Sequence, residues 1–155
     1  MSSGRCPQTC LKPRTELCWT EVSARPTWDE WAIAIARAVG TRADCSRRKV
    51  GAVITDRQHR VVATGYNGAP PGRIGCLDGG CPRGRASATE IPPYSDYGNC
   101  ISNHAEVNAL LFSSRREVEG GVLYVTDEPC HGCWKVIDNS GLSRVVWPDG
   151  EHNYE

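Results

Sequence analysis

Hydrophobic residues recur at helical spacing near the start of the chain and at strand spacing further along. Thr27-Trp-Asp-Glu is a capping-box pattern, and it precedes apolar residues spaced three to four apart, so it predicts a helix over about 27–40. Two apolar runs at 50–55 and 60–65 flank the polar turn Asp56-Arg-Gln-His, and this arrangement predicts a β-hairpin. The helical apolar positions are Trp28, Trp31, Ile35 and Val39.

The second half of the chain alternates between helical and strand patterns. A helix is expected from His104 onward, with Asn103 as its N-cap, and a second short helix is expected over 130–139. Apolar runs at 121–126 and 144–147 predict strands, the latter as the last strand. Strands that alternate with helices after a hairpin predict a layered α/β domain around a mixed sheet.

Residues 67–100 interrupt these patterns with a long stretch rich in Gly and Pro that contains three cysteines. A loop of this length inside a compact domain needs a reason, such as a metal site that holds it or a binding role. Residues 1–25 show no sustained period, so we expect an N-terminal extension there, followed by one domain at 26–155. No apolar run approaches the length of a membrane span and no secretory signal is seen, so we expect a cytoplasmic protein.

The charge balance narrows the class of partner. The chain has 18 Lys and Arg against 18 Asp and Glu, which gives a formal net charge of zero. A protein that grips long nucleic acid is expected to be strongly basic, so a small substrate is favoured and nucleic acid and membrane partners are not.

Nine cysteines in 155 residues are too few for a small disulfide scaffold, and their number is odd. Metal-bound thiolates are therefore the favoured interpretation. The alternative is a scatter of reduced, buried thiols.

Two short motifs carry the candidate chemistry. His104-Ala-Glu106 alone is a weak signal and is better explained by a surface pair on a helix. Cys130-His-Gly-Cys133 alone fits two interpretations: it could supply two ligands of a structural zinc site, or it could be a redox dithiol. Together, in this order and each at a predicted helix N-terminus, they match the zinc deaminase signature. His131 is expected to face solvent or to contact the ligand residues, and not to bind the metal itself.

The combined motif assigns a role to each side chain. His104, Cys130 and Cys133 would bind Zn²⁺ and leave its fourth position to a water molecule. The metal would acidify that water, and Glu106 would shuttle its proton to the ring nitrogen and then to the leaving amine. Thiolates are favoured at a helix N-terminus because unpaired backbone N–H groups stabilise negative charge there.

The chain resembles the deoxycytidylate (dCMP) deaminase family of the cytidine deaminase superfamily from about Arg25 to Trp147. The segments that carry the resemblance are Arg25-Pro-Thr-Trp-Asp-Glu, Cys45-Ser-Arg-Arg-Lys-Val-Gly-Ala-Val-Ile, Gly65-Tyr-Asn-Gly-Ala-Pro-Pro-Gly, the pair Cys76 and Cys81, Cys100 with His104-Ala-Glu, and Leu123-Tyr-Val-Thr with Pro-Cys-x-x-Cys. The resemblance implies a three-layer α/β/α fold with a central mixed sheet, and hydrolysis of dCMP to dUMP and ammonia.

The resemblance also implies the substrate contacts. Asn67 would help to hold the nucleotide, and the backbone amide of Ala105 would lie beside the pyrimidine. For the 5′-phosphate, Arg47, Arg48 and Lys49 are candidates on charge alone, and a solvated basic turn is the alternative.

Bacterial and phage members similar to this chain often carry a second, structural zinc, and four cysteines occupy the corresponding positions: Cys45, Cys76, Cys81 and Cys100. The alternative is that two or three of these cysteines are reduced, buried thiols. For Cys6, Cys10 and Cys18, unstructured thiols are favoured over a third metal site.

Many members of the family are activated by dCTP, inhibited by dTTP and assembled as hexamers. The resemblance therefore implies a homo-oligomer, with the hexamer as its family form, and these two effectors. The chain ends at Glu155, whereas members usually continue through a further strand or helix that helps to complete the nucleotide site.

Two other functional classes remain open. The substrate could be a modified cytidine nucleotide, a free nucleoside, or a base within single-stranded nucleic acid. A single Phe and the absence of a long basic run count against the last of these. Alternatively, the chain could be a non-catalytic module held by zinc, although such a module would have no need for Glu106.

Overall fold

A computed structural model describes residues 25–91, 97 and 99–155 of the protein. The predicted extension at 1–25 lies outside these residues except for Arg25, and so do Cys6, Cys10 and Cys18. The described elements are α1 (Trp28–Gly40), β1 (Gly51–Thr55), β2 (Val61–Tyr66), α2 (Pro82–Arg85), the 3₁₀ helix η2 (Ala88–Glu90), α3 (Ala105–Leu111), α4 (Arg115–Val118), β3 (Val122–Val125), α5 (His131–Ile137), β4 (Arg144–Trp147) and β5 (Gly150–Asn153).

Helix α1 begins where the capping pattern predicts. The Glu30 amide donates to Thr27 Oγ1 at 3.2 Å, and the Thr27 amide donates to the Glu30 carboxylate at 2.8 Å. Both hydrogen bonds satisfy amides that a helix N-terminus leaves without partners. The predicted helix is therefore confirmed, with Thr27 as its N-cap.

The sheet has five strands in the order β2-β1-β3-β4-β5. β1 and β2 form the predicted antiparallel hairpin, β3 and β4 run parallel, and the two remaining pairs are antiparallel. The predicted mixed sheet is confirmed. The strand at 144–147 is not the last, however, because β5 follows it and forms one edge of the sheet.

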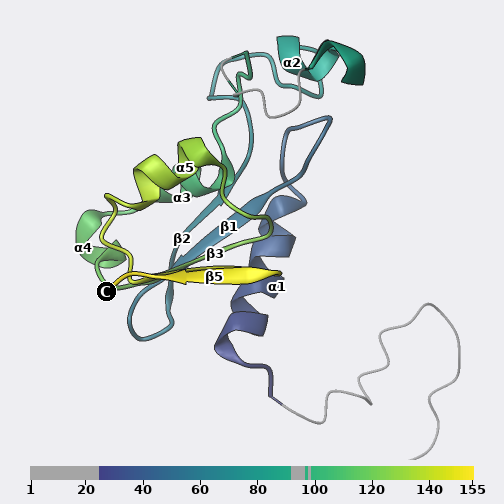
Figure 1. Ribbon diagram of the computed structural model, residues 1–155. Helices are drawn as coiled ribbons and strands as arrows, with labels where there is room; N and C mark the ends of the chain where they lie inside the picture. Colours follow the sequence, from purple (N-terminus) through teal and green to yellow (C-terminus); the bar gives the residue numbers. More distant parts are fainter. Residues whose placement is uncertain (1–24, 92–96, 98) are drawn as a thin grey trace, which may run out of the picture.

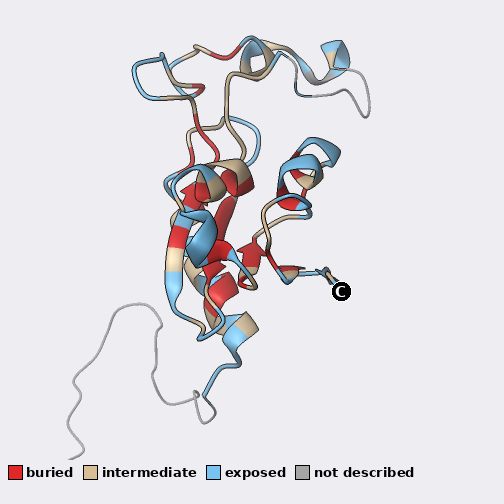
Figure 2. Ribbon diagram, turned by 90° about the vertical axis from the view of Figure 1, so that its left-hand side faces the viewer, coloured by how far each residue is buried: buried red, intermediate tan, exposed pale blue. Residues whose placement is uncertain are grey.

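The two faces of the sheet carry different helices (Figure 1). In β3, Tyr124 packs with Ala32 and Ile33 of α1, whereas its neighbours Leu123 and Val125 pack in the cluster that includes residues of α3 and α5. This alternation is the period of a β-strand with both faces covered. The predicted α/β/α layering follows from it, and Figure 2 shows the buried residues concentrated in the sheet and on the inner helix faces.

The Gly- and Pro-rich segment projects from this body (Figure 1). It is closed at its base where Gly68 and Asn103 exchange two backbone hydrogen bonds of 3.2 and 3.0 Å. Within it, the Asp44 carboxylate accepts hydrogen bonds from the amides of Cys76 and Leu77 at 3.0 and 2.9 Å. These bonds lower the pKa of Asp44. The segment is thus tied to the body at its base and at Asp44.

Among the described residues, no helix is long and apolar enough to cross a membrane.

Candidate metal centre and active site

Helix α3 begins at the first motif. His104 is its N-cap, with an extended backbone, and Glu106 lies in its first turn. The prediction of Asn103 as N-cap is wrong because Asn103 is occupied in the backbone pairing with Gly68, which delays the start of the helix by one residue. The Asn108 side chain donates to the Tyr66 carbonyl at 2.8 Å and fixes α3 against β2.

Helix α5 begins at the second motif, with Cys130 as its N-cap and Cys133 buried in its first turn. The Nδ1 atom of His104 lies 3.4 Å from Cys130 Sγ and 3.2 Å from Cys133 Sγ. The three ligand atoms all lie within 4.8 Å of one another, and no other group of three such residues does so in the described parts of the chain. His131, between the two cysteines, is exposed as expected.

This donor set fits zinc. Two thiol sulfurs and one imidazole nitrogen are ligands that Zn²⁺ prefers, and three protein ligands leave one position of a tetrahedral ion open. Burial raises the pKa of the Cys133 thiol, and the neighbouring Glu106 and Cys130 raise it further. A divalent cation would offset this accumulation of negative charge. Burial also lowers the pKa of His104, which favours the neutral imidazole that binds metals.

Glu106 is only 4% exposed, although it is a carboxylic acid. Burial raises its pKa, and the charge of Asp127 raises it further. A buried carboxyl with a raised pKa, beside a candidate metal centre, is suited to accept and return protons near neutral pH.

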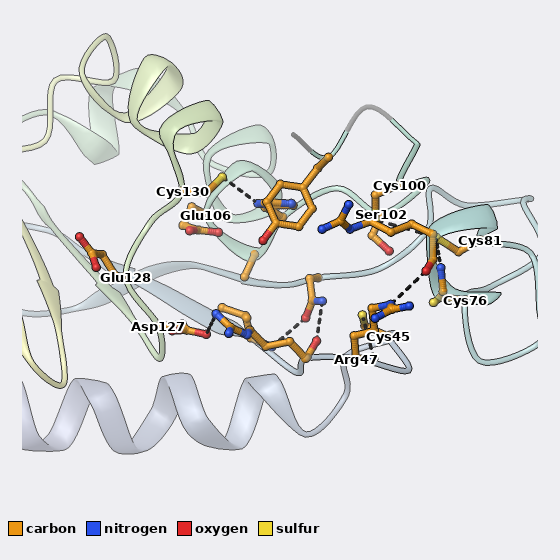
Figure 3. Close-up of a pocket in the computed structure, with 18 residues that line it drawn as sticks. Cys45, Arg47, Cys76, Cys81, Cys100, Ser102, Glu106, Asp127, Glu128 and Cys130 are labelled. Atoms are coloured by element: carbon orange, nitrogen blue, oxygen red, sulfur yellow. Dashed lines mark hydrogen bonds and ion pairs between the residues drawn. The ribbon is translucent and has the colours of Figure 1, made fainter. Parts of the chain in front are cut away.

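A cavity of about 280 Å³ adjoins the centre, and Figure 3 shows its lining. Glu106 and Cys130 lie towards one end of the cavity, and the cysteines of the projecting segment lie towards the other (Figure 3). Ala105, predicted to lie beside the pyrimidine, lines the cavity. The cavity therefore lies between the α/β body and the projecting segment, and both contribute to its lining.

Asn67 also lines the cavity and is buried. Its side-chain oxygen accepts from the Val50 amide at 2.8 Å, and its side-chain nitrogen donates to the Arg48 carbonyl at 2.9 Å. Each bond uses one of the capacities of a primary amide, so one N–H and one lone pair remain. Asn67 thus holds the backbone of residues 48–50 at the cavity wall.

The three residues predicted to bind the 5′-phosphate differ in their positions and contacts. Arg48 lines the cavity and forms an ion pair with Asp127 at 2.8 Å. Arg47 also lines it, but its guanidinium donates to the backbone carbonyls of Arg83 and Ala86. Lys49 is exposed and does not line the cavity, so its phosphate contact stays a prediction with no support from the lining.

Sequence reasoning missed two lining residues from the projecting segment, Arg83 and Tyr97. The Arg83 guanidinium lies over the Tyr97 ring, 4.8 Å from its centroid, and the Tyr97 ring meets the His104 imidazole edge-on at 4.5 Å. No local signal separates Arg83 from its exposed neighbour Arg85, because the fold of the segment alone brings Arg83 to the cavity.

The four remaining described cysteines line the part of the cavity away from Glu106 (Figure 3), but no three of their sulfurs lie within 4.8 Å of one another. All six described cysteines are free. Cys81 Sγ lies 3.9 Å from Cys100 Sγ. Burial opposes ionisation of Cys81, but bonds from the amides of Ile101 and Gly84 outweigh it and lower the pKa of this thiol. Burial raises the pKa of Cys100. Cys45 and Cys76 accept or share hydrogen bonds with Arg47 and Ser46, respectively.

A sequence model described as "Cytidine and deoxycytidylate deaminase zinc-binding region" matches residues 26–148. The chain belongs to this deaminase family. It is 48% identical over 129 residues to the deoxycytidylate deaminase of Mycobacterium phage D29, covering 81% of this chain and 97% of that protein. It is 39% identical over 124 residues to the deoxycytidylate deaminase of Saccharomyces cerevisiae, covering 79% of this chain and 38% of that protein.

A solved structure shares the fold. The dCMP deaminase of cyanophage S-TIM5, crystallised in complex with dCMP and dUMP, superposes with a TM-score of 0.61 at 27% identity, covering 80% of this chain and 82% of that one. Membership of the family makes this protein a zinc-dependent deaminase, and its His/Cys/Cys group is the candidate zinc centre. The family match ends at residue 148, so strand β5 lies beyond it.

Proposed function

We propose that this deaminase hydrolyses dCMP to dUMP and ammonia. The observation that carries the proposal is the convergence of His104, Cys130 and Cys133 beside a buried Glu106 at one end of a cavity. Support for the substrate comes from the relatives, since the phage D29 protein that matches over nearly its whole length is a deoxycytidylate deaminase.

His104 Nδ1 and the two sulfurs would hold the zinc, which when bound acts as a Lewis acid and brings the pKa of a water molecule towards neutrality. The neutral state of His104, favoured by its burial, leaves an imidazole lone pair for this purpose. Cys130 is the N-cap of α5 and Cys133 lies in its first turn, so one helix end carries both sulfurs. These three residues would therefore act by holding the zinc ion in place.

Glu106 would move the protons. It accepts one proton from the attacking water and delivers it to the ring nitrogen next to the attacked carbon. It then transfers the second proton of that water to the leaving amine, so that one water and one dCMP give one dUMP and one ammonia. Its burial keeps bulk water from competing for these protons.

The remaining cavity residues would bind the nucleotide. Asn67 offers its unused N–H and lone pair, and the Ala105 amide lies at the N-terminus of α3. For the 5′-phosphate we propose Arg48 together with Arg83, because both line the cavity. Arg47 instead supports the site by holding the backbone around α2.

Ammonia release with dCMP, CMP, deoxycytidine, dCTP and 5-substituted dCMP, measured side by side, tests the substrate. The highest kcat/KM is expected with dCMP. Arg83→Ala should raise KM for dCMP about tenfold and leave deoxycytidine unaffected, because it removes a charged hydrogen bond to phosphate. Arg85→Ala, on the same helix but outside the cavity, is the matched control. Equal turnover of deoxycytidine and dCMP would contradict a phosphate site, and no turnover of any substrate would favour a binding module.

We also propose a second, structural zinc held by Cys45, Cys76, Cys81 and Cys100. The position of all four on the cavity wall and the 3.9 Å between Cys81 Sγ and Cys100 Sγ support it, and closing the site would require the other two sulfurs to move closer. Metal analysis should find about two zinc ions per chain, and about one in Cys81→Ser. One ion in both proteins would favour the reduced-thiol alternative.

We also propose that the chain forms a homo-oligomer, with the hexamer as the form expected from the family. Two large apolar side chains at the end of α3 support it, since Leu111 is 63% and Phe112 76% exposed. Light scattering measures the mass. The cytoplasmic location and the dCTP and dTTP effectors stay predictions.

A further inference from the structure

The C-terminal strand, which lies outside the family match, contacts the helix that carries the two thiols. Trp134 of α5 packs edge-on against Trp147 of β4, with ring centroids 6.1 Å apart, and against His152 of β5 at 5.4 Å. His152 in turn meets Tyr154 edge-on at 4.6 Å. We name these three residues the C-terminal clasp: Trp147, His152 and Tyr154.

The clasp acts near the metal end of α5. Trp134 directly follows Cys133, and its amide donates to the Cys130 carbonyl at 3.1 Å, so it closes the turn that holds both sulfurs. Edge-on aromatic contacts fix orientation as well as distance. A rotation of α5 about its axis would therefore break the contacts of Trp134 and move Cys133 at the same time.

The clasp also acts at the other end of the helix. The Tyr154 hydroxyl donates to Asp138 Oδ1 at 2.6 Å, and Asp138 is the C-cap of α5. The Tyr154 amide donates to the Ser143 carbonyl at 2.9 Å, which ties the end of the chain to the start of β4. Both ends of α5 are thus attached to the β4-β5 edge.

Helix α5 needs this attachment because it has only 7 residues. Helices of this length are not stable alone and depend on tertiary contacts. Cys133 and Ile137 are buried in the core, and Trp134, Trp147 and Tyr154 are partly buried and pack against the same core, whereas His152 is exposed. The core contacts set the depth of the helix, and the clasp adds a constraint on its rotation.

We propose that the C-terminal clasp is a positioning device for the thiol pair: it holds Cys130 and Cys133 in the orientation that binds zinc and slows release of the ion. The proposal rests on the metal centre of the proposed function. It also gives residues 150–155 a role, although they lie outside the family match. His152 and Tyr154 are positioning residues, since neither lines the cavity or belongs to the ligand group.

Zinc release from the full-length, zinc-loaded protein into excess chromogenic chelator tests the proposal. His152→Ala and Tyr154→Phe should each accelerate release from the His104 centre about three- to tenfold, as expected for loss of one aromatic contact or one hydrogen bond. His152→Phe keeps an aromatic ring against Trp134 and should release zinc at nearly the wild-type rate. The release phase is assigned to this centre by its loss in Cys130→Ser and its retention in Cys81→Ser.

A matched control separates positioning from general stability. Ile33→Val removes a methylene group from the core cluster of α1 on the opposite face of the sheet, so it should lower Tm without accelerating zinc release. Near-UV circular dichroism should show loss of the Trp134 contact signal in His152→Ala and its recovery in His152→Phe.

Wild-type release rates in both His152→Ala and Tyr154→Phe would overturn the clasp. Equal acceleration in Ile33→Val at the same loss of Tm would overturn it too, because general stability would then explain the effect. Failure of the metal centre itself looks different: Cys130→Ser would then bind and release zinc as the wild type does.

Discussion

At the scale of the residue, burial makes Glu106 useful for proton transfer but costly for the stability of the fold. The side chain is 4% exposed, and burial raises its pKa because the charged form loses its hydration. Its position in the first turn of α3 offers partial compensation, since its own backbone amide lowers that pKa. A carboxyl kept in such surroundings serves proton transfer better than it serves stability.

The first prediction follows from this position. Glu106→Gln should keep the metal centre but reduce kcat for dCMP by about a hundredfold or more, because an amide cannot relay a proton. Ammonia release measures the loss, and metal analysis checks the zinc content. Glu119→Gln, on the surface near α4, removes the same charge and should retain full activity. Substantial turnover by Glu106→Gln would refute the proposed shuttle.

At the scale of the element, the position of α3 depends on a glycine in β2. A Cβ atom built on Gly65 would lie 2.1 Å from the Ala105 carbonyl oxygen and 2.4 Å from the Ala109 amide nitrogen. Both are backbone atoms, so no side chain could move aside to accept it. The helix that carries His104 and Glu106 therefore lies directly on the strand.

Gly65→Ala should accordingly displace α3. We expect a loss of about 1–3 kcal/mol in the free energy of unfolding, which is typical of overpacking, together with reduced kcat/KM. Denaturant titration and the ammonia assay measure the two effects. Gly68→Ala is a close control because its Cβ would meet nothing nearer than the Tyr66 ring at 3.5 Å. If the two substitutions behaved alike, the contact between β2 and α3 would not be as tight as described.

The elements also show what the sequence could and could not predict. α1 and the hairpin were predictable because capping and apolar spacing are local. β5 was not, because Gly150-Glu-His-Asn has no apolar alternation and the strand is held at the sheet edge by backbone pairing with β4. α4 was missed although its capping box, Ser114 with Glu117, is visible in the sequence.

The candidate site divides in the same way. The His104, Cys130 and Cys133 group could be predicted because each motif starts a helix and the metal demands one common point. Arg83 and Tyr97 could not, since they approach the cavity through the fold of a long segment whose contacts, such as Asp44 with Cys76, are distant in sequence.

At the scale of the whole molecule, one ionic network joins the first helix to the last strands. Arg144 of β4 donates to Asp29 of α1 at 2.7 and 3.0 Å and also pairs with Glu151 of β5. The buried Tyr124 hydroxyl donates to the same Asp29 carboxylate at 3.0 Å. Burial alone would raise the pKa of Asp29, but the bonds from Arg144 and Tyr124 outweigh it and lower this pKa.

This shift gives a pH dependence with a definite sign. A carboxyl with a lowered pKa in the folded state stabilises the protein above its unfolded pKa, near 3.8, and loses this contribution as pH falls through the folded value. Asp29→Asn keeps an acceptor for Tyr124 but removes the charge. It should cost about 0.5–1 kcal/mol at neutral pH, a small value because the pair is partly exposed and screened.

Denaturant titrations of the wild type and Asp29→Asn across a pH series check this prediction. The difference between them should be constant from neutral pH down to about pH 5, shrink below the ordinary pKa of 3.8, and decrease with added salt. Asp149→Asn, which removes an exposed carboxylate at the turn between β4 and β5, should show no such difference. A gap that widened on acidification would mean that Asp29 binds its proton more tightly in the folded state, and the network would then oppose folding at neutral pH.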